Sequence, residues 1–88
     1  MNTASGTSAL RLNTTGSNNT ANGYNSGSAL TTGNNNTFIG NNAQPTSGGI
    51  SNQIRIGDAN ITSAHIQIAW TISSDLRVDS RNLYPTKY

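Results

Sequence analysis

Polar, uncharged residues dominate the first half of the chain, and large apolar residues become frequent only in the second half. Residues 1–48 hold seven large apolar side chains, whereas residues 49–88 hold thirteen, of which seven are isoleucine. Apolar residues alternate with other residues at Ile54 and Ile56, and again at every second position over residues 66–72. This period of two predicts strands with one buried face, which becomes more apolar towards the C-terminal end.

A short phrase recurs every 17 residues in the polar half. The phrases NTASG, NTANG, NTFIG and QIRIG end at Gly6, Gly23, Gly40 and Gly57, and the same register aligns Asn18, Asn35 and Asn52 as well as Asn2, Asn19 and Asn36. A constant period with a recurring glycine is typical of a solenoid, in which every coil turns at the same place and stacks on its neighbour. A flexible linker of low complexity is the alternative, but low complexity does not usually fix one phase over four copies.

The residue types within each repeat predict its local structure. Threonine, isoleucine and phenylalanine before the glycine favour a short strand, and the glycine suits a corner with positive φ. Asparagines repeated at one position of every coil are expected to hydrogen-bond along the stack. The pattern therefore predicts an all-β solenoid with coils of about 17 residues, each made of two short strands and two turns.

The composition limits what one copy can do alone. Asn, Thr, Ser and Gly account for 46 of the 88 residues, Leu, Ile, Val and Phe for only 15, and the net charge is +2. A globule of this length buries only about 60% of its unfolded surface even with an ordinary apolar content. We therefore expect the chain to associate with copies of itself, and three copies around one axis would cover both the sheet edges and the apolar face.

Several classes of protein are disfavoured by what the sequence lacks. There is no cysteine for a disulfide or a thiolate metal site, and the five basic residues are scattered, which argues against nucleic-acid binding. No apolar run is long enough to insert in a membrane, and the first ten residues do not have the pattern of a secretory signal. No cofactor is expected.

Residues 2 to about 79 resemble a known family of surface fibres. The segment NTTGSNNTANGYNSGSALTTGNNNTFIGNNA resembles the left-handed β-roll repeats of trimeric adhesin heads and phage tail-fibre proteins, and NQIRIGDANITSAHIQIAWTISSDLRV is similar to the tail-fibre junction that leads into an intramolecular chaperone of the endosialidase type. The resemblance implies an intertwined homotrimeric fibre. It divides the chain into left-handed parallel β-roll repeats over 1–59, an intertwined β-segment over 60–76, and a C-terminal tail or truncated chaperone junction over 77–88.

The resemblance also implies a candidate cleavage point. In this family the chaperone begins at a Ser-Asp-x-Arg-[Leu/Ile]-Lys motif, before which the chain cuts itself, and Ser74, Asp75 and Arg77 match it. Asp79 stands where the motif has lysine, so no basic group is available there to assist proton transfer to Ser74. A structural Ser-Asp turn is therefore the expectation, and the protein is not expected to be an enzyme.

The remaining candidate chemistry is sparse. His65, the only histidine, is expected on the strand face opposite the isoleucines, where three copies could meet on a threefold axis and bind a metal or anion. A surface histidine is the alternative. The three aspartates do not have the paired setting that a glycosidase needs. Phe38 and Trp70 could stack on carbohydrate, but their strand patterns favour core packing.

These observations predict a structural and adhesive protein of the virion, a segment of a phage tail fibre that attaches to the host surface by multivalent contact. The expected partners are neighbouring tail-fibre segments and a glycan or protein receptor on the host cell. Three alternatives remain: a bacterial trimeric adhesin head at the cell surface, a self-assembling extracellular filament, and an ice-binding solenoid. The last would need regular threonine rows, which only the pairs at Thr14 and Thr31 suggest.

Overall fold

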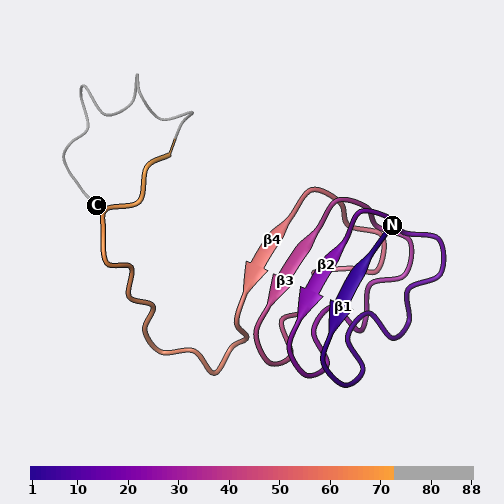
Figure 1. The fold of residues 1–88 in the computed structure, drawn as a ribbon, viewed down its shortest axis with the longest axis horizontal. Helices are drawn as coiled ribbons and strands as arrows, with labels where there is room; N and C mark the ends of the chain where they lie inside the picture. Colours follow the sequence, from indigo (N-terminus) through magenta and orange to yellow (C-terminus); the bar gives the residue numbers. More distant parts are fainter. Residues whose placement is uncertain (73–88) are drawn as a thin grey trace.

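The computed structural model describes residues 1–72 and places four short strands in one parallel sheet. The strands are β1 (Thr3–Ser5), β2 (Thr20–Asn22), β3 (Thr37–Ile39) and β4 (Ile54–Ile56), and they lie in the sheet in chain order (Figure 1). Residues 1–72 contain no helix. The predicted all-β class is confirmed, and the parallel arrangement is that of a solenoid-like fold.

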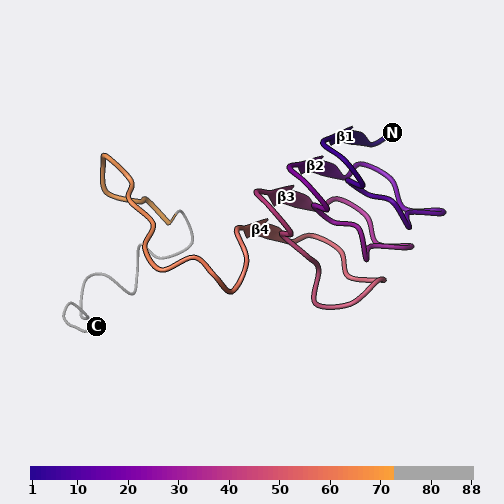
Figure 2. The same ribbon diagram turned by 90° about the horizontal axis from the view of Figure 1, so that it is seen from below.

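The strands pair in an unbroken register. Thr3 lies beside Thr20, Thr20 beside Thr37, and Thr37 beside Ile54, so that partners are 17 residues apart at every step. We call the chain from one strand to the next a coil. Figure 2 shows the successive coils lying one behind another along the stack. Because parallel strands need a crossover connection, each coil has to travel around the body before it returns to the sheet.

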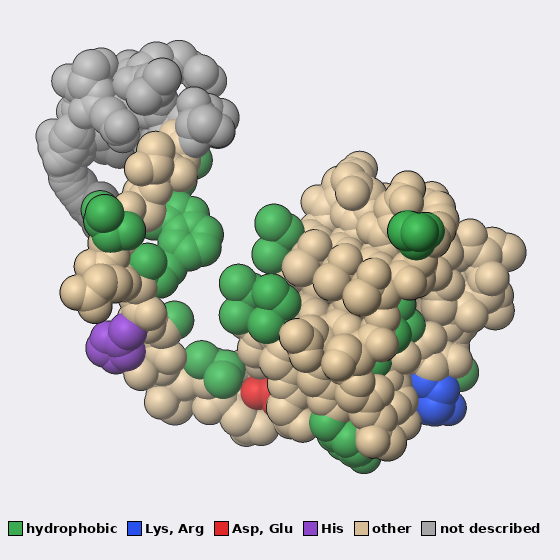
Figure 3. Space-filling view, in the orientation of Figure 1, with side chains coloured by type: hydrophobic (Ala, Val, Ile, Leu, Met, Phe, Trp, Pro, Cys, Tyr) green, Lys and Arg blue, Asp and Glu red, His purple; other side chains and the backbone are tan. Residues whose placement is uncertain are grey.

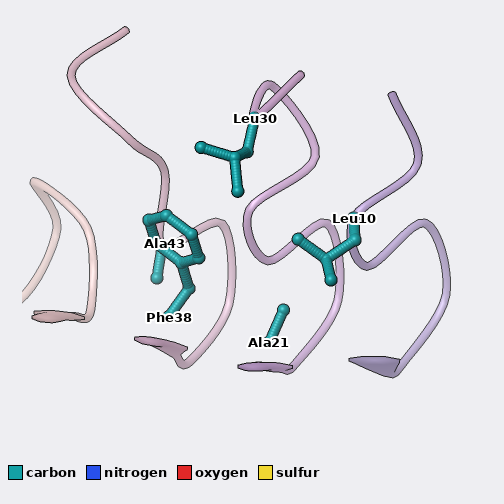
Figure 4. Close-up of a cluster of buried hydrophobic side chains, with 5 residues drawn as sticks. All are labelled: Leu10, Ala21, Leu30, Phe38 and Ala43. Carbon is teal, nitrogen blue, oxygen red and sulfur yellow. The ribbon is translucent and has the colours of Figure 1, made fainter. Parts of the chain in front are cut away.

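A small apolar core lies between the sheet and the returning loops. Its five buried members are Leu10, Ala21, Leu30, Phe38 and Ala43. Ala21 and Phe38 project from β2 and β3 towards the leucines of the opposite loops (Figure 4). Phe38 is fully buried, as its strand pattern predicts. With so few large side chains, the core supplies only part of the contact between coils.

Polar side chains occupy the rest of the interior, and the two largest of them are asparagines. Asn19 and Asn36 are each only 1% exposed. The Asn19 Oδ1 accepts hydrogen bonds from the backbone N–H and the Nδ2 of Asn36, both at 3.0 Å. Asn2 Oδ1 accepts in the same way from the backbone N–H of Asn19 at 2.9 Å, and Asn36 Oδ1 from that of Gln53 at 3.0 Å. We call these four residues the amide column, and it links every coil to the next.

The other aligned asparagines have a different role. Asn18, Asn35 and Asn52 are exposed and lie in the left-handed region, with φ of 60°, 62° and 64°. Asparagine tolerates this conformation better than most residues do. Asn35 Nδ2 donates to Asn52 Oδ1 at 2.9 Å, so these two asparagines bond between coils at the surface.

The four repeating glycines lie just after the strands, and all have positive φ, from 82° at Gly57 to 133° at Gly23. The coils also approach each other closely at Gly6 and Gly23. A Cβ atom on Gly23 would lie 2.7 Å from the carbonyl oxygen of Gly40. The glycine is therefore required both by its backbone conformation and by the next coil.

The stack ends after Gly57, and residues 58–72 run away from it without a strand (Figure 1). The alternation over residues 66–72 predicts a strand, but the single chain does not form one there. An extended segment needs a neighbouring backbone to pair with, and residues 58–72 have no described strand beside them. The prediction that this segment is intertwined with other copies is not tested by one chain.

Replacing Asn19 tests how much the amide column contributes to the stability of the fold. Replacing Asn19 by alanine removes the acceptor of the Asn36 N–H and the Nδ2 donor that bonds to the Gly33 carbonyl at 2.9 Å. Because both groups would remain buried without a partner, we expect a loss of about 2–4 kcal/mol in the free energy of unfolding. The exposed Asn41, changed to alanine as a control, should cost about 0.5 kcal/mol or less. Urea unfolding followed by circular dichroism measures both, and equal losses would contradict the structural role of the column.

The glycine corner makes a second test. We expect Gly23→Ala to cost at least about 2 kcal/mol, because alanine is strained at this φ and its Cβ would overlap the backbone of Gly40. Gly49→Ala is the matched control, since its Cβ would meet only Thr32 Oγ1 at 3.4 Å. Thermal unfolding compares the two variants. A Gly23→Ala protein as stable as the Gly49→Ala protein would show that the coils do not need this close approach.

Candidate interaction surface

The outer face of the sheet changes from polar to apolar along the stack. Thr20 and Asn22 occupy the outer positions of β2, and the register leads from them to Ile54 and Ile56 on β4. The two isoleucines are 73% and 63% exposed, and Ile39 on β3 is also exposed. The alternation at Ile54 and Ile56 therefore forms a strand as predicted, but its apolar face lies on the outside of the single chain.

The segment after the stack adds more apolar side chains to this face. Ile56, Ile61, Ile66 and Trp70 line a groove of about 560 Å³ between the end of the stack and the departing chain. Figure 3 shows apolar side chains on the β4 side of the stack and on the segment opposite. Trp70 was expected in a core, but in the single chain it is 64% exposed.

We call six exposed side chains together the isoleucine surface: Ile39, Ile54, Ile56, Ile61, Ile66 and Trp70. Soluble proteins rarely leave large contiguous apolar patches uncovered, and such patches usually mark an interface. The contrast with the interior strengthens this interpretation, because residues 1–72 bury only five apolar residues in their core. More large apolar side chains lie on this surface than inside.

A second hollow lies at the end of the stack and has a different character. Its volume is about 610 Å³, and the residues that line it include Asn42, Gln44, Arg55 and Asp58. The Gln44 Nε2 is already engaged by the carbonyl of Asn25 at 2.8 Å. The hollow brings together one guanidinium, one carboxylate and several amides, without a nucleophile beside a base. It offers hydrogen bonds and charge, and no arrangement for acid–base or nucleophilic catalysis.

The candidate residues named from the sequence fall in separate places. His65 lines the groove of the isoleucine surface. Within residues 1–72 no three His, Cys, Asp or Glu side chains gather to hold a metal ion. A site made by His65 from three copies stays a prediction. Ser74 and Asp75 lie outside the described residues. The repeating glycines and asparagines are all at the corners or in the interior of the stack.

Two features of the last coil are not predicted from the sequence: the inward position of Arg55 and the unpartnered amide oxygen of Gln53. Arg55 pairs in register with Phe38, so it occupies the inward position of its strand. Gln53 stands where the earlier coils have asparagine, and its Oε1 is buried without a hydrogen-bond partner among the described residues. Aligning QIRIG with NTFIG gives Arg55 the position that Phe38 has one coil earlier. The sequence signal was present, but its meaning depends on knowing which strand face is buried.

The residues described thus form an all-β, solenoid-like stack that ends in an exposed apolar surface. Comparison with known protein families, with curated proteins and with solved structures found no match. In residues 1–72 there is also no helix of the length and apolarity required to cross a membrane.

Proposed function

We propose that the chain is a structural and adhesive segment of a viral tail fibre, which forms a homotrimer and attaches the virion to a bacterial surface. In this proposal each chain is a left-handed parallel β-roll with coils of about 17 residues. The constant 17-residue spacing between strand partners supports the coil length. The resemblance of the repeats and of the junction to tail-fibre proteins supports the handedness and the class.

The isoleucine surface is the single observation that carries the proposed assembly. Burying one isoleucine is worth about 1.5–3 kcal/mol, and the five isoleucines of this surface stay exposed unless another copy covers them. A rotational arrangement of identical chains buries the same surface on every copy and closes on itself. Three copies, with residues 60–76 intertwined, would turn this surface into the interior of a fibre.

The proposed role is attachment without catalysis. The coils present a polar, nearly uncharged outside, and the hollow beside Arg55 offers amides and charge suited to holding a ligand. A glycan or a protein on the host cell is the expected receptor, contacted three times by one fibre. Weak sites on a common rigid support gain strongly from being held together. A bacterial adhesin head would use the same scaffold, so the scaffold alone does not separate the two settings.

The assembly is tested by mass. We expect sedimentation equilibrium to give about 28 kDa, three times the 9.2 kDa of one chain. In the double variant Ile54→Thr/Ile56→Asn, β4 carries the outer residues of β2, and we expect the association to weaken at least about 100-fold because two isoleucines per chain are lost. Leu12→Thr, an exposed leucine of the first coil, is the control and should stay trimeric. A folded chain that remains 9.2 kDa at all concentrations would rule out the trimer.

Attachment is tested separately on whole cells. Fluorescently labelled wild-type protein should be retained on receptor-bearing bacteria after dilution, whereas the Ile54→Thr/Ile56→Asn variant should be released at least about tenfold faster, since it binds through single sites. The Leu12→Thr protein should behave as the wild type. Equal release of the trimeric and the dissociated proteins from the same cells would contradict multivalent attachment.

A further inference from the structure

Both ends of the sheet are strand edges that match each other. The Gly57 N–H donates to the Ile39 carbonyl at 2.8 Å, as each repeating glycine does to the coil before it. A further coil on β4 would bond in the same way to the carbonyl of Ile56, and Gly6 of a second copy carries the N–H for it. Since all strands run parallel (Figure 1), β1 of one copy can continue the sheet from β4 of another.

The first coil has the residues that such a continuation needs. Asn2, Ala4 and Gly6 repeat the residue types of Asn19, Ala21 and Gly23 in the same register. The amide column also ends on an unpartnered acceptor, because Gln53 Oε1 is buried and has no hydrogen-bond partner among the described residues. In the column, this position accepts the N–H of the asparagine one coil further on, as Asn36 Oδ1 accepts that of Gln53. A latent end-to-end interface is therefore complementary in its backbone and in its amides.

One side chain opposes this interface. The register runs from Ala21 to Phe38 to Arg55, and the first two are buried in the core. Arg55 thus holds an inward position and reaches water only because no coil follows it. A second copy stacked on β4 would place the methyl group of its Ala4 over the guanidinium. That methyl group has no acceptor, so the charge would lose its water without gaining a partner.

Ile61 adds a weaker obstacle. A Cβ atom on Gly57 would lie 2.6 Å from Ile61 Cγ1, so this side chain rests where the glycine corner of another coil would come. Ile61 is exposed and belongs to the departing segment, and its flexible end can move aside. The Arg55 side chain differs, because as long as it faces inward its charge stays within the interface. Charged residues that face inward on edge strands are a known means of preventing edge-to-edge assembly.

We propose that Arg55 is a stop residue, which keeps β4 from pairing with β1 of a second copy and so prevents the chain from growing into end-to-end filaments. This role concerns the axis of the stack, whereas the strand residues of the isoleucine surface, Ile39, Ile54 and Ile56, lie on the outer face of the sheet. It does not depend on the trimer.

The test compares Arg55→Ala, which restores the residue type found in β2, with wild type and with Arg11→Ala. Arg11 is an exposed arginine of the first coil, so its variant has the same change in net charge. We expect the weight-average mass of Arg55→Ala to rise with concentration to at least about tenfold that of wild type in sedimentation, with rods in negative stain, because a head-to-tail contact does not close. Wild type and Arg11→Ala should keep one mass.

Further variants decide whether the charge is the cause. Arg55→Lys keeps the charge and should stay unassembled, and Arg55→Gln, which is neutral and of similar length, should assemble. The double variant Arg55→Ala/Ile61→Ala removes both obstacles and should assemble more readily than Arg55→Ala. The proposal is overturned if this double variant keeps its β-type circular dichroism but does not gain mass. It is also overturned if Arg55→Lys assembles as Arg55→Ala does, or if the wild-type protein itself forms filaments. A wild-type monomer would end the trimer proposal and leave this one standing.

Discussion

The hydrogen bonds of the buried asparagine amides set the geometry of the whole stack. Asn36 donates both its backbone N–H and its Nδ2 to Asn19 Oδ1, and its Nδ2 also reaches the Ile50 carbonyl at 2.8 Å. Each amide therefore ties one strand to the next coil and to the far side of the interior. A slip of one residue would leave these buried groups without partners, and this is costly in a medium that excludes water. The strict register of the strands follows from that requirement.

An interior of hydrogen-bonded amides fixes the register of the strands more than it adds to the free energy of unfolding. A satisfied buried hydrogen bond contributes about 1 kcal/mol net, whereas an unsatisfied one costs more than that. The apolar contribution is small as well, since the core contains only Phe38, two leucines and two alanines. The stack is thus well specified but weakly supported by burial. Covering the isoleucine surface with further copies adds the kind of energy that the interior lacks, and this is the physical case for the proposed assembly.

The sequence reveals the period, the strand before each repeating glycine and the glycine corners, because each depends on local residue types repeated at one spacing. The second strand that it predicts in each coil is not formed in residues 1–72. It does not reveal which asparagine set is buried. Asn18, Asn35 and Asn52 align as well as Asn2, Asn19 and Asn36 do, and only the backbone separates them by placing the first set at exposed positions with φ near 60°. Leu10, at φ 55°, carries no local signal for that conformation either. These features are fixed by the neighbouring coils and not by the residue itself.

The isoleucine surface is also only partly predictable from the sequence. The alternation at Ile54 and Ile56 predicts a strand and one apolar face, but it does not say that the face lies outside. The alternation over residues 66–72 predicts a strand that has no strand to pair with among residues 1–72. Alternation shows which side chains share a face, but it does not show what covers that face.

The point where the stack stops explains why the apolar surface lies where it does. A fifth coil in the same phase would place Trp70 in the amide column and Ser74 at the glycine corner. The column position is enclosed at Asn36, so an indole does not fit there, and Ser74 would have to adopt the positive φ of the repeating glycines, which strains a residue that has a Cβ. The chain therefore cannot continue as stacked coils. The isoleucines and the tryptophan of the isoleucine surface therefore have no interior of their own among residues 1–72, and the proposed assembly would bury them against further copies.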